Sequence, residues 1–118
     1  MQYLLLIYGN EPLWNKMTEA EHGKISQEYA DFTKSIASSG HLKGGNELDR
    51  TSTATTVRMR DGKRLVTDGP FAETKEQLGG YYLIEAKDLD DAIAVASRIP
   101  SVRWGSIEVR PIIFHPMP

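Results

Sequence analysis

Residues 2–8 restrict the possible folds most, because they predict a β-strand with apolar side chains on both faces. The two alternating sets are Leu4, Leu6 and Tyr8 on one face, and Tyr3, Leu5 and Ile7 on the other. A strand of this kind needs cover on both sides of its sheet. The fold must therefore bury two sheet faces.

Two amphipathic helices are predicted. The first begins at a capping-box pattern, Thr18 and Glu21, and ends at Gly40. Its apolar residues recur at helical spacing: Ile25, Tyr29, Phe32 and Ile36. The second helix is capped by Asp88 and ended by Pro100. Its predicted buried stripe consists of Leu89, Ala92, Ile93, Ala96 and Ile99.

The further predicted strands are residues 42–48, 54–60, 63–68, 80–86 and 107–114. The second and third of these flank Asp61-Gly62, a two-residue connection typical of a type I′ hairpin turn. The order predicts an α+β fold of the βαββαβ type with an inserted β-hairpin and both helices on one sheet face. The other face would be bare yet apolar, so we expect a homodimer that packs sheet on sheet.

Composition excludes several classes of protein. With 118 residues, 40% of them hydrophobic, the chain predicts one domain, residues 1–118. It has no cysteine, which excludes disulfides, thiolate metal sites and thiol nucleophiles. A net charge of -2 gives no general attraction to nucleic acid. No apolar run is long enough for a membrane span and no signal peptide is evident, so we expect a cytoplasmic protein without membrane or nucleic-acid partners.

Motifs for cofactors are missing as well. The three histidines lie without metal-ligand spacing. Glycine-rich phosphate loops and the nucleophile elbow of serine hydrolases do not occur. We therefore expect no cofactor and no metal.

The most distinctive motif lies in residues 66–82, VTDGPFAETKEQLGGYY. Its Asp68-Gly69-Pro70 step is strong turn chemistry, because glycine reaches backbone angles closed to other residues and proline fixes its own φ. Asp68 would end a strand at this turn. Its carboxylate could face a cavity, cap the following backbone or pair with a cation. The sequence does not choose among these roles.

Several strings carry a resemblance to a known family: ATTVR at 54–58, DG at 61–62, VTDGPFAETKEQLGGYYLIEA at 66–86 and SIEVRPI at 106–112. Over nearly the whole chain they resemble YCII-related proteins of the DGPF subgroup. The resemblance implies a ferredoxin-like unit whose sheet pairs with that of a second subunit in a dimeric α+β barrel. It implies no established biochemical role. Subgroup members often lie beside genes for extracytoplasmic-function sigma factors, which implies stress-linked regulation or detoxification.

The chain departs from the wider family at one position. A histidine on the first helix and an aspartate are proposed there as a catalytic pair. Counting back from Gly40 places Tyr29 where that histidine would fall, and no aspartate can be placed as its partner. The pair is therefore not carried over. His22, two turns earlier on another face of the helix, is expected to be solvated.

The candidate catalytic residues are Asp68 and Tyr29, and the candidate binding residues are Arg58, Gly69, Pro70, Phe71, Tyr82 and Arg110. Tyr29 could instead be a core residue with its hydroxyl at a cavity edge. Arg58 and Arg110 suit an anionic ligand, although salt bridges in a dimer explain them equally well. Trp104 could wall a pocket or close the core.

Two functions remain open. The first is small-molecule binding or cofactor-independent catalysis in a cavity between sheet and helices, with Asp68 as proton carrier and Tyr29 and Arg58 orienting the ligand. The second is a non-catalytic regulatory or sensing module whose loop at residues 68–71 docks a protein partner or senses a metabolite. For the first, we expect Asp68 near the mouth of a pocket that Tyr29 or Arg58 also lines.

Overall fold

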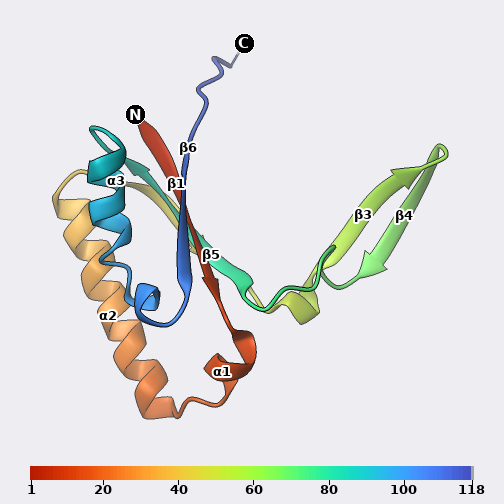
Figure 1. The fold of residues 1–118 in the computed structure, drawn as a ribbon, viewed down its shortest axis with the longest axis horizontal. Coiled ribbons are helices and arrows are strands. Elements are labelled where there is room, and N and C mark those ends of the chain that lie inside the picture. The colour runs from red at the N-terminus through yellow and green to blue at the C-terminus, as the bar shows by residue number, and fades with distance from the viewer. Residues whose placement is uncertain (118) are drawn as a thin grey trace.

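The computed structural model describes residues 1–117 and shows an antiparallel sheet with helices on one side (Figure 1). The strands are β1 (Gln2–Gly9), β2 (Leu42–Glu47), β3 (Thr55–Arg60), β4 (Lys63–Asp68), β5 (Gln77–Glu85) and β6 (Ser106–Pro111). The helices are α1 (Glu11–Asn15), α2 (Glu19–Ser38) and α3 (Leu89–Ala96), with short 3₁₀ turns η1 (Thr51–Thr53) and η2 (Pro100–Arg103).

Four strands form the main sheet in the order β2-β5-β1-β6, with every neighbouring pair antiparallel. In the register of the central strand, Leu5 lies between Tyr82 of β5 and Val109 of β6. This order, with α2 and α3 as the two crossover helices, is a ferredoxin-like α+β arrangement. The predicted fold class is confirmed.

The core lies between this sheet and the two long helices. Its fully buried side chains are Leu5, Ile36, Ile84 and Ile99. The predicted start of α2 is confirmed, because Thr18 and Glu21 form both hydrogen bonds of the capping box. From α2, the buried residues are Ile25, Phe32 and Ile36, which lie on one stripe of the helix.

The predicted stripe of α3 is partly wrong. Leu89 and Ile93 are 49% and 46% exposed, whereas Val95, which the pattern omitted, is buried. The buried side chains Ala92 and Ala96 are small, so α3 approaches the sheet along this line and Leu89 and Ile93 are left outside. Ile99 is buried as expected, but it follows the end of the helix.

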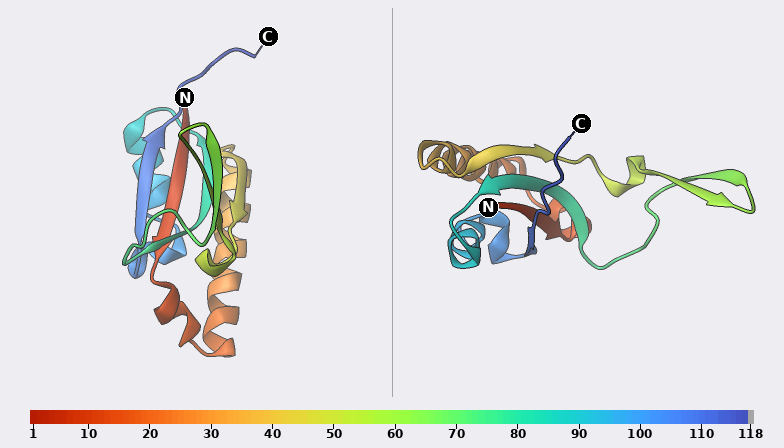
Figure 2. Two further views of the ribbon diagram at one scale, coloured as in Figure 1. Left: turned by 90° about the vertical axis from the view of Figure 1, so that its right-hand side faces the viewer. Right: turned by 90° about the horizontal axis from the view of Figure 1, so that it is seen from above.

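The second sheet face carries apolar residues that the helices do not cover. On this face Leu4 pairs with Leu83 and Leu6 pairs with Tyr81, and all four are partly buried. Figure 2 shows α2 and α3 on one side of the sheet and the β3–β4 hairpin on the other. We call this surface, made by Leu4, Leu6, Tyr81 and Leu83, the open sheet face.

Strands β3 and β4 form a separate two-stranded sheet. Their turn has positive φ at both Asp61 (51°) and Gly62 (73°), which confirms the predicted type I′ hairpin. The hairpin projects away from the main sheet on the side of the open sheet face (Figures 1 and 2). We call residues 55–68 the arm.

Several boundaries differ from the sequence-based expectation. Strand β5 begins at Gln77, three residues before the predicted start, because its first residues pair with the end of β1 beyond a bulge. Strand β6 ends at Pro111, and the short helix α1 was not predicted. Within residues 1–117, no helix is both long enough and apolar enough to cross a membrane.

Candidate functional site

A pocket of about 500 Å³ lies between α2 and the main sheet, beside α1 and η2. Its walls come from the middle of α2, the bulged end of β1, strands β2 and β5, and η2. The aromatic residues that contribute to its lining are Tyr8, Trp14, Tyr29, Tyr81, Tyr82 and Trp104. A mostly apolar pocket with a few polar groups, of this volume, is the usual form of a small-molecule site.

Two pairs of hydroxyl groups lie in this pocket. The hydroxyls of Tyr29 and Ser101 share a hydrogen bond of 2.5 Å between α2 and η2. The hydroxyls of Thr33 and Tyr82 share one of 2.7 Å between α2 and β5. Tyr29 and Thr33 are one helical turn apart, so both pairs are presented by the same face of α2. The pocket can therefore offer donors and acceptors from opposite walls.

The protonation of Tyr29 follows from its surroundings. Burial raises the pKa of the Tyr29 hydroxyl, and the hydrogen bond to Ser101 opposes that effect only in part. The nearby Tyr82 and Glu47 raise the pKa of Tyr29 further. A negative charge on Tyr29 is unfavourable beside an ionised Tyr82 hydroxyl or the Glu47 carboxylate. Tyr29 is therefore a neutral hydroxyl at neutral pH, able to donate a hydrogen bond or a proton to a ligand.

The turn after η2 sets the position of the Ser101 wall. The N–H of Gly105 donates to the Ser101 carbonyl at 2.7 Å. A Cβ at Gly105 would lie 2.2 Å from the Tyr8 carbonyl oxygen, so only glycine lets this turn lie against β1. Trp104 lines the pocket, with the Arg103 guanidinium 4.9 Å from its ring centroid. Trp104 thus forms a pocket wall, one of the two roles expected for it.

Helix α1 closes the pocket on another side. The Trp14 ring stacks on the His22 ring with centroids 4.3 Å apart, and His22 Nε2 lies 2.8 Å from the Trp14 carbonyl oxygen. The expectation of a merely solvated His22 is therefore wrong, because the unpredicted helix α1 packs on it. The Asn10 side chain caps α1 by accepting a hydrogen bond from the Leu13 N–H. An asparagine followed two residues later by Pro12 is a typical helix start, so this pattern could have predicted α1.

Charged residues gather at the pocket rim. Three carboxylates line it, those of Glu11, Glu47 and Asp49, against the single guanidinium of Arg50. The Glu11 carboxylate accepts from the Thr51 N–H at 3.1 Å, which ties α1 to η1. The rim of the described pocket is thus net negative.

The structure divides the predicted site residues into two groups. Tyr29 and Tyr82 line the pocket, whereas Arg58, Asp68, Gly69, Pro70, Phe71 and Arg110 do not. The expected convergence of Asp68 with Tyr29 does not occur within one chain, because β4 leaves the main sheet and carries Asp68 away with the arm. Thr33 and Ser101 were missed; Thr33 could have been found by its spacing of one helical turn from Tyr29.

The loop that follows the arm is ordered by its backbone. Gly69 has a φ of +97°, its N–H donates to the Ala54 carbonyl at 2.7 Å, and its own carbonyl accepts from the Thr56 hydroxyl at 2.8 Å. The expectation that Gly69 serves through backbone freedom is confirmed. Within residues 1–117, the Asp68 carboxylate makes neither a hydrogen bond nor an ion pair, so the capping role is not seen.

The arginines and Phe71 are exposed. Arg58 Nη2 donates to the Phe71 carbonyl at 3.4 Å, a long contact across the base of the arm. The Phe71 side chain is 78% exposed, and Pro70 beside it is exposed as well. Arg110 pairs in register with Leu4 and therefore belongs to β6 at the open sheet face. These residues are presented to solvent in the single chain.

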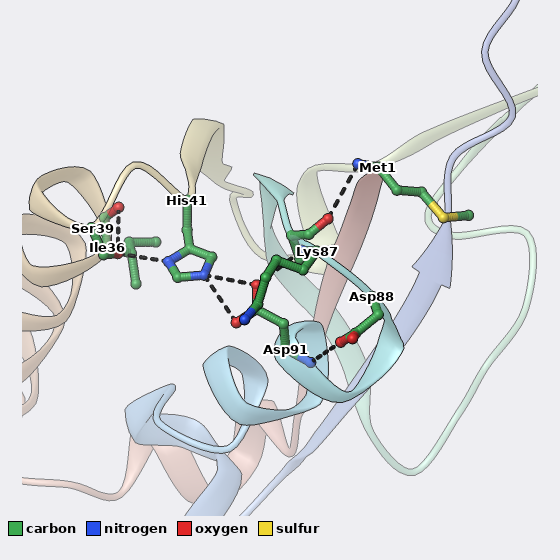
Figure 3. Close-up of polar contacts among 8 residues, drawn as sticks. Met1, Ile36, Ser39, His41, Lys87, Asp88 and Asp91 are labelled. Atoms are coloured by element: carbon green, nitrogen blue, oxygen red, sulfur yellow. Dashed lines mark hydrogen bonds and ion pairs between the residues drawn. The ribbon is translucent and has the colours of Figure 1, made fainter.

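A second polar cluster lies beyond the C-terminal end of α2 (Figure 3). His41 Nδ1 lies 2.6 Å from the Ser39 hydroxyl, and its Nε2 lies 3.1 Å from both carboxylate oxygens of Asp91. Asp91 also accepts from the Lys87 N–H at 3.0 Å. These contacts join the end of α2 to the start of α3. Among residues 1–117, no three histidine, aspartate or glutamate side chains are grouped so that they could hold a metal ion.

Fold and pocket together define a small ferredoxin-like α+β protein with a pocket between its helices and its sheet. The model of the YCII-related domain matches residues 1–115. An uncharacterized protein of Rhizobium meliloti (strain 1021) is 34% identical over 117 residues, which cover 98% of this chain and 94% of that protein. The chain belongs to the YCII-related family.

Proposed function

We propose that this protein binds a small organic molecule in the pocket between α2 and the main sheet. The observation that carries the proposal is the pair of hydroxyl hydrogen bonds across the pocket, Tyr29 with Ser101 and Thr33 with Tyr82. In a mostly apolar pocket, polar groups of this kind fix the orientation of a ligand while the aromatic walls supply most of the contact area. Tyr29, held neutral, is the group that donates to a ligand oxygen or transfers a proton to it.

The proposal includes a cytoplasmic homodimer. The open sheet face exposes part of Leu4, Leu6, Tyr81 and Leu83 in one chain. A second copy packed sheet on sheet would cover this surface, since an apolar face of a sheet is normally buried. Light scattering should then give about twice the mass of the chain, which is 13.2 kDa.

A thermal-shift screen with a panel of metabolites tests the binding function. A compound that binds should raise the melting temperature of the natural protein and raise that of Tyr29→Phe clearly less. Tyr3→Phe is the matched control, because Tyr3 is buried in the core and does not line the pocket. Equal shifts for both variants would show that Tyr29 has no role, and ligand contacts mapped outside the pocket would refute the site.

A non-catalytic regulatory module, linked to stress-responsive sigma-factor signalling, is the second candidate. It is favoured by the position of the loop at residues 68–71, which lies outside the pocket with Phe71 78% exposed. For this function Phe71→Ala should abolish binding of a purified sigma factor and leave the metabolite-induced thermal shift unchanged. An unchanged affinity for the sigma factor would remove this candidate.

A further inference from the structure

We propose that the arm of one copy packs on a second copy of this chain and completes the rim of that copy's pocket. The inference rests on the proposed function only in taking the pocket as the binding site.

The arm has an apolar face that its own chain leaves uncovered. In the hairpin register Val57 lies opposite Val66, and Met59 follows two residues later on the same face. Their exposed fractions are 61%, 58% and 58%. An isolated two-stranded hairpin is at best marginally stable in water and requires packing for stability. Another surface must therefore cover this face.

The charge of the arm indicates that a second copy of this chain covers its apolar face. The arm carries Arg58, Arg60, Lys63 and Arg64 against Asp61 and Asp68, a net charge of +2. With a net charge of -2 for the chain, all other residues together carry -4. The pocket rim, with three carboxylates and one guanidinium, is among the acidic surfaces. A basic arm is thus attracted to the body of another copy.

The direction and the length of the arm are consistent with a second copy of the chain as its partner. The arm projects on the side of the open sheet face, away from the helices of its own chain (Figure 2). A second copy stacked on that face would have its sheet about 10 Å away, whereas a six-residue strand spans about 20 Å. The arm is therefore long enough to extend past the partner's sheet toward the layer between sheet and helices, which contains the partner's pocket. By two-fold symmetry each arm serves the pocket of the other copy.

This arrangement assigns a place to one cationic residue near the tip of the arm. Arg64 lies opposite Met59 in the hairpin register, on the apolar face of the arm, and would meet the acidic rim of the partner's pocket, made by Glu47 and Asp49. Its charge would compensate part of that rim and narrow its opening. The pocket of a single chain is thus incomplete, and residues from two copies converge on one site although they lie apart in each copy.

Cross-linking between single-cysteine variants tests the inference, because the natural chain has no cysteine. Met59→Cys, on the apolar face of the arm, is mixed with Leu48→Cys, at the pocket rim, and treated with a short bismaleimide. Leu65→Cys is the matched control, since Leu65 is similarly exposed but lies on the other face of the hairpin. We expect a cross-linked heterodimer with Met59→Cys and loss of that product with Leu65→Cys.

Val57→Glu gives a second measurement on the intact chain. Val57 is exposed in the single chain, so circular dichroism should stay unchanged while the dissociation constant of the dimer rises about tenfold or more, as expected for a charge buried without a partner. Leu65→Glu should leave the dimer unchanged. The inference would be overturned if the natural protein were monomeric or if Val57→Glu dimerised as the natural chain does. It would also be overturned if cross-links formed only between two Met59→Cys chains, or if Leu65→Cys gave the same yield as Met59→Cys. None of these results depends on a ligand, so failure of the proposed binding function is measured separately.

Discussion

Substitution of Gly105 by alanine should separate η2 from β1 and destabilise the protein strongly. The added Cβ would lie 2.2 Å from the Tyr8 carbonyl oxygen and 3.3 Å from that of Ser101. The first distance is about 1 Å shorter than an ordinary contact between non-bonded heavy atoms. Both obstacles are backbone atoms, so no side-chain rotation relieves the clash. Because Tyr8 pairs with Ser106, any shift must also distort the β1–β6 ladder.

The magnitude follows from these contacts. Overpacking in a well-packed region costs about 1–3 kcal/mol, and a backbone clash belongs at the upper end. Loss of the hydrogen bond from Gly105 to Ser101 adds about 1 kcal/mol. We therefore expect a loss of about 4 kcal/mol in the free energy of unfolding, which corresponds to a fall in melting temperature on the order of 15 °C for a chain of this size. The same shift should weaken ligand binding, because it moves the Ser101 wall.

Urea unfolding followed by circular dichroism measures this loss. Gly23→Ala is the matched control, since Gly23 lies inside α2 and an added Cβ meets no atom within 4 Å. Alanine there should raise the free energy of unfolding by about 0.5–1 kcal/mol through its helix preference. If Gly105→Ala and Gly23→Ala had the same effect, the close approach of η2 to β1 would not be the reason for glycine at residue 105.

Three further predictions concern stability. Gly69→Ala should lower the free energy of unfolding by about 1 kcal/mol, because its φ of +97° is unfavourable for alanine. The added methyl group meets no atom within 4 Å, so no clash adds to this cost. An unchanged urea unfolding curve would contradict the prediction. Ile36→Ala, at a fully buried position, should cost about 2–5 kcal/mol in the same assay. The hydrogen bond from the Lys87 N–H, and then His41, lower the pKa of Asp91 in the folded chain. The stabilisation from Asp91 is therefore present above the unfolded pKa of about 3.9 and is lost as pH falls through the lower folded value. Asp91→Asn should remove this part of the pH dependence in acid unfolding curves, and an unchanged curve would exclude it.

Elements that depend on neighbouring residues could be predicted from the sequence. The capping box at Thr18 and Glu21, the hairpin turn at Asp61-Gly62 and the positive φ of Gly69 are all present. In each case the determining interactions lie within a few residues, so the local pattern contains the necessary information. The apolar residues on both faces of β1 likewise indicated a sheet with helices on one side and an uncovered apolar face on the other.

The site depended on contacts between distant residues. Tyr29 and Ser101 lie 72 positions apart, and Thr33 and Tyr82 lie 49 apart, so no local pattern brings either pair together. Only the packing of α2 against η2 and β5 does so. The same holds for Asp68: its turn chemistry is local, but the direction of the arm is set by which strands join the main sheet. The sequence by itself therefore determined the elements and their turns, whereas the tertiary structure decided which side chains share a pocket, because that depends on long-range packing.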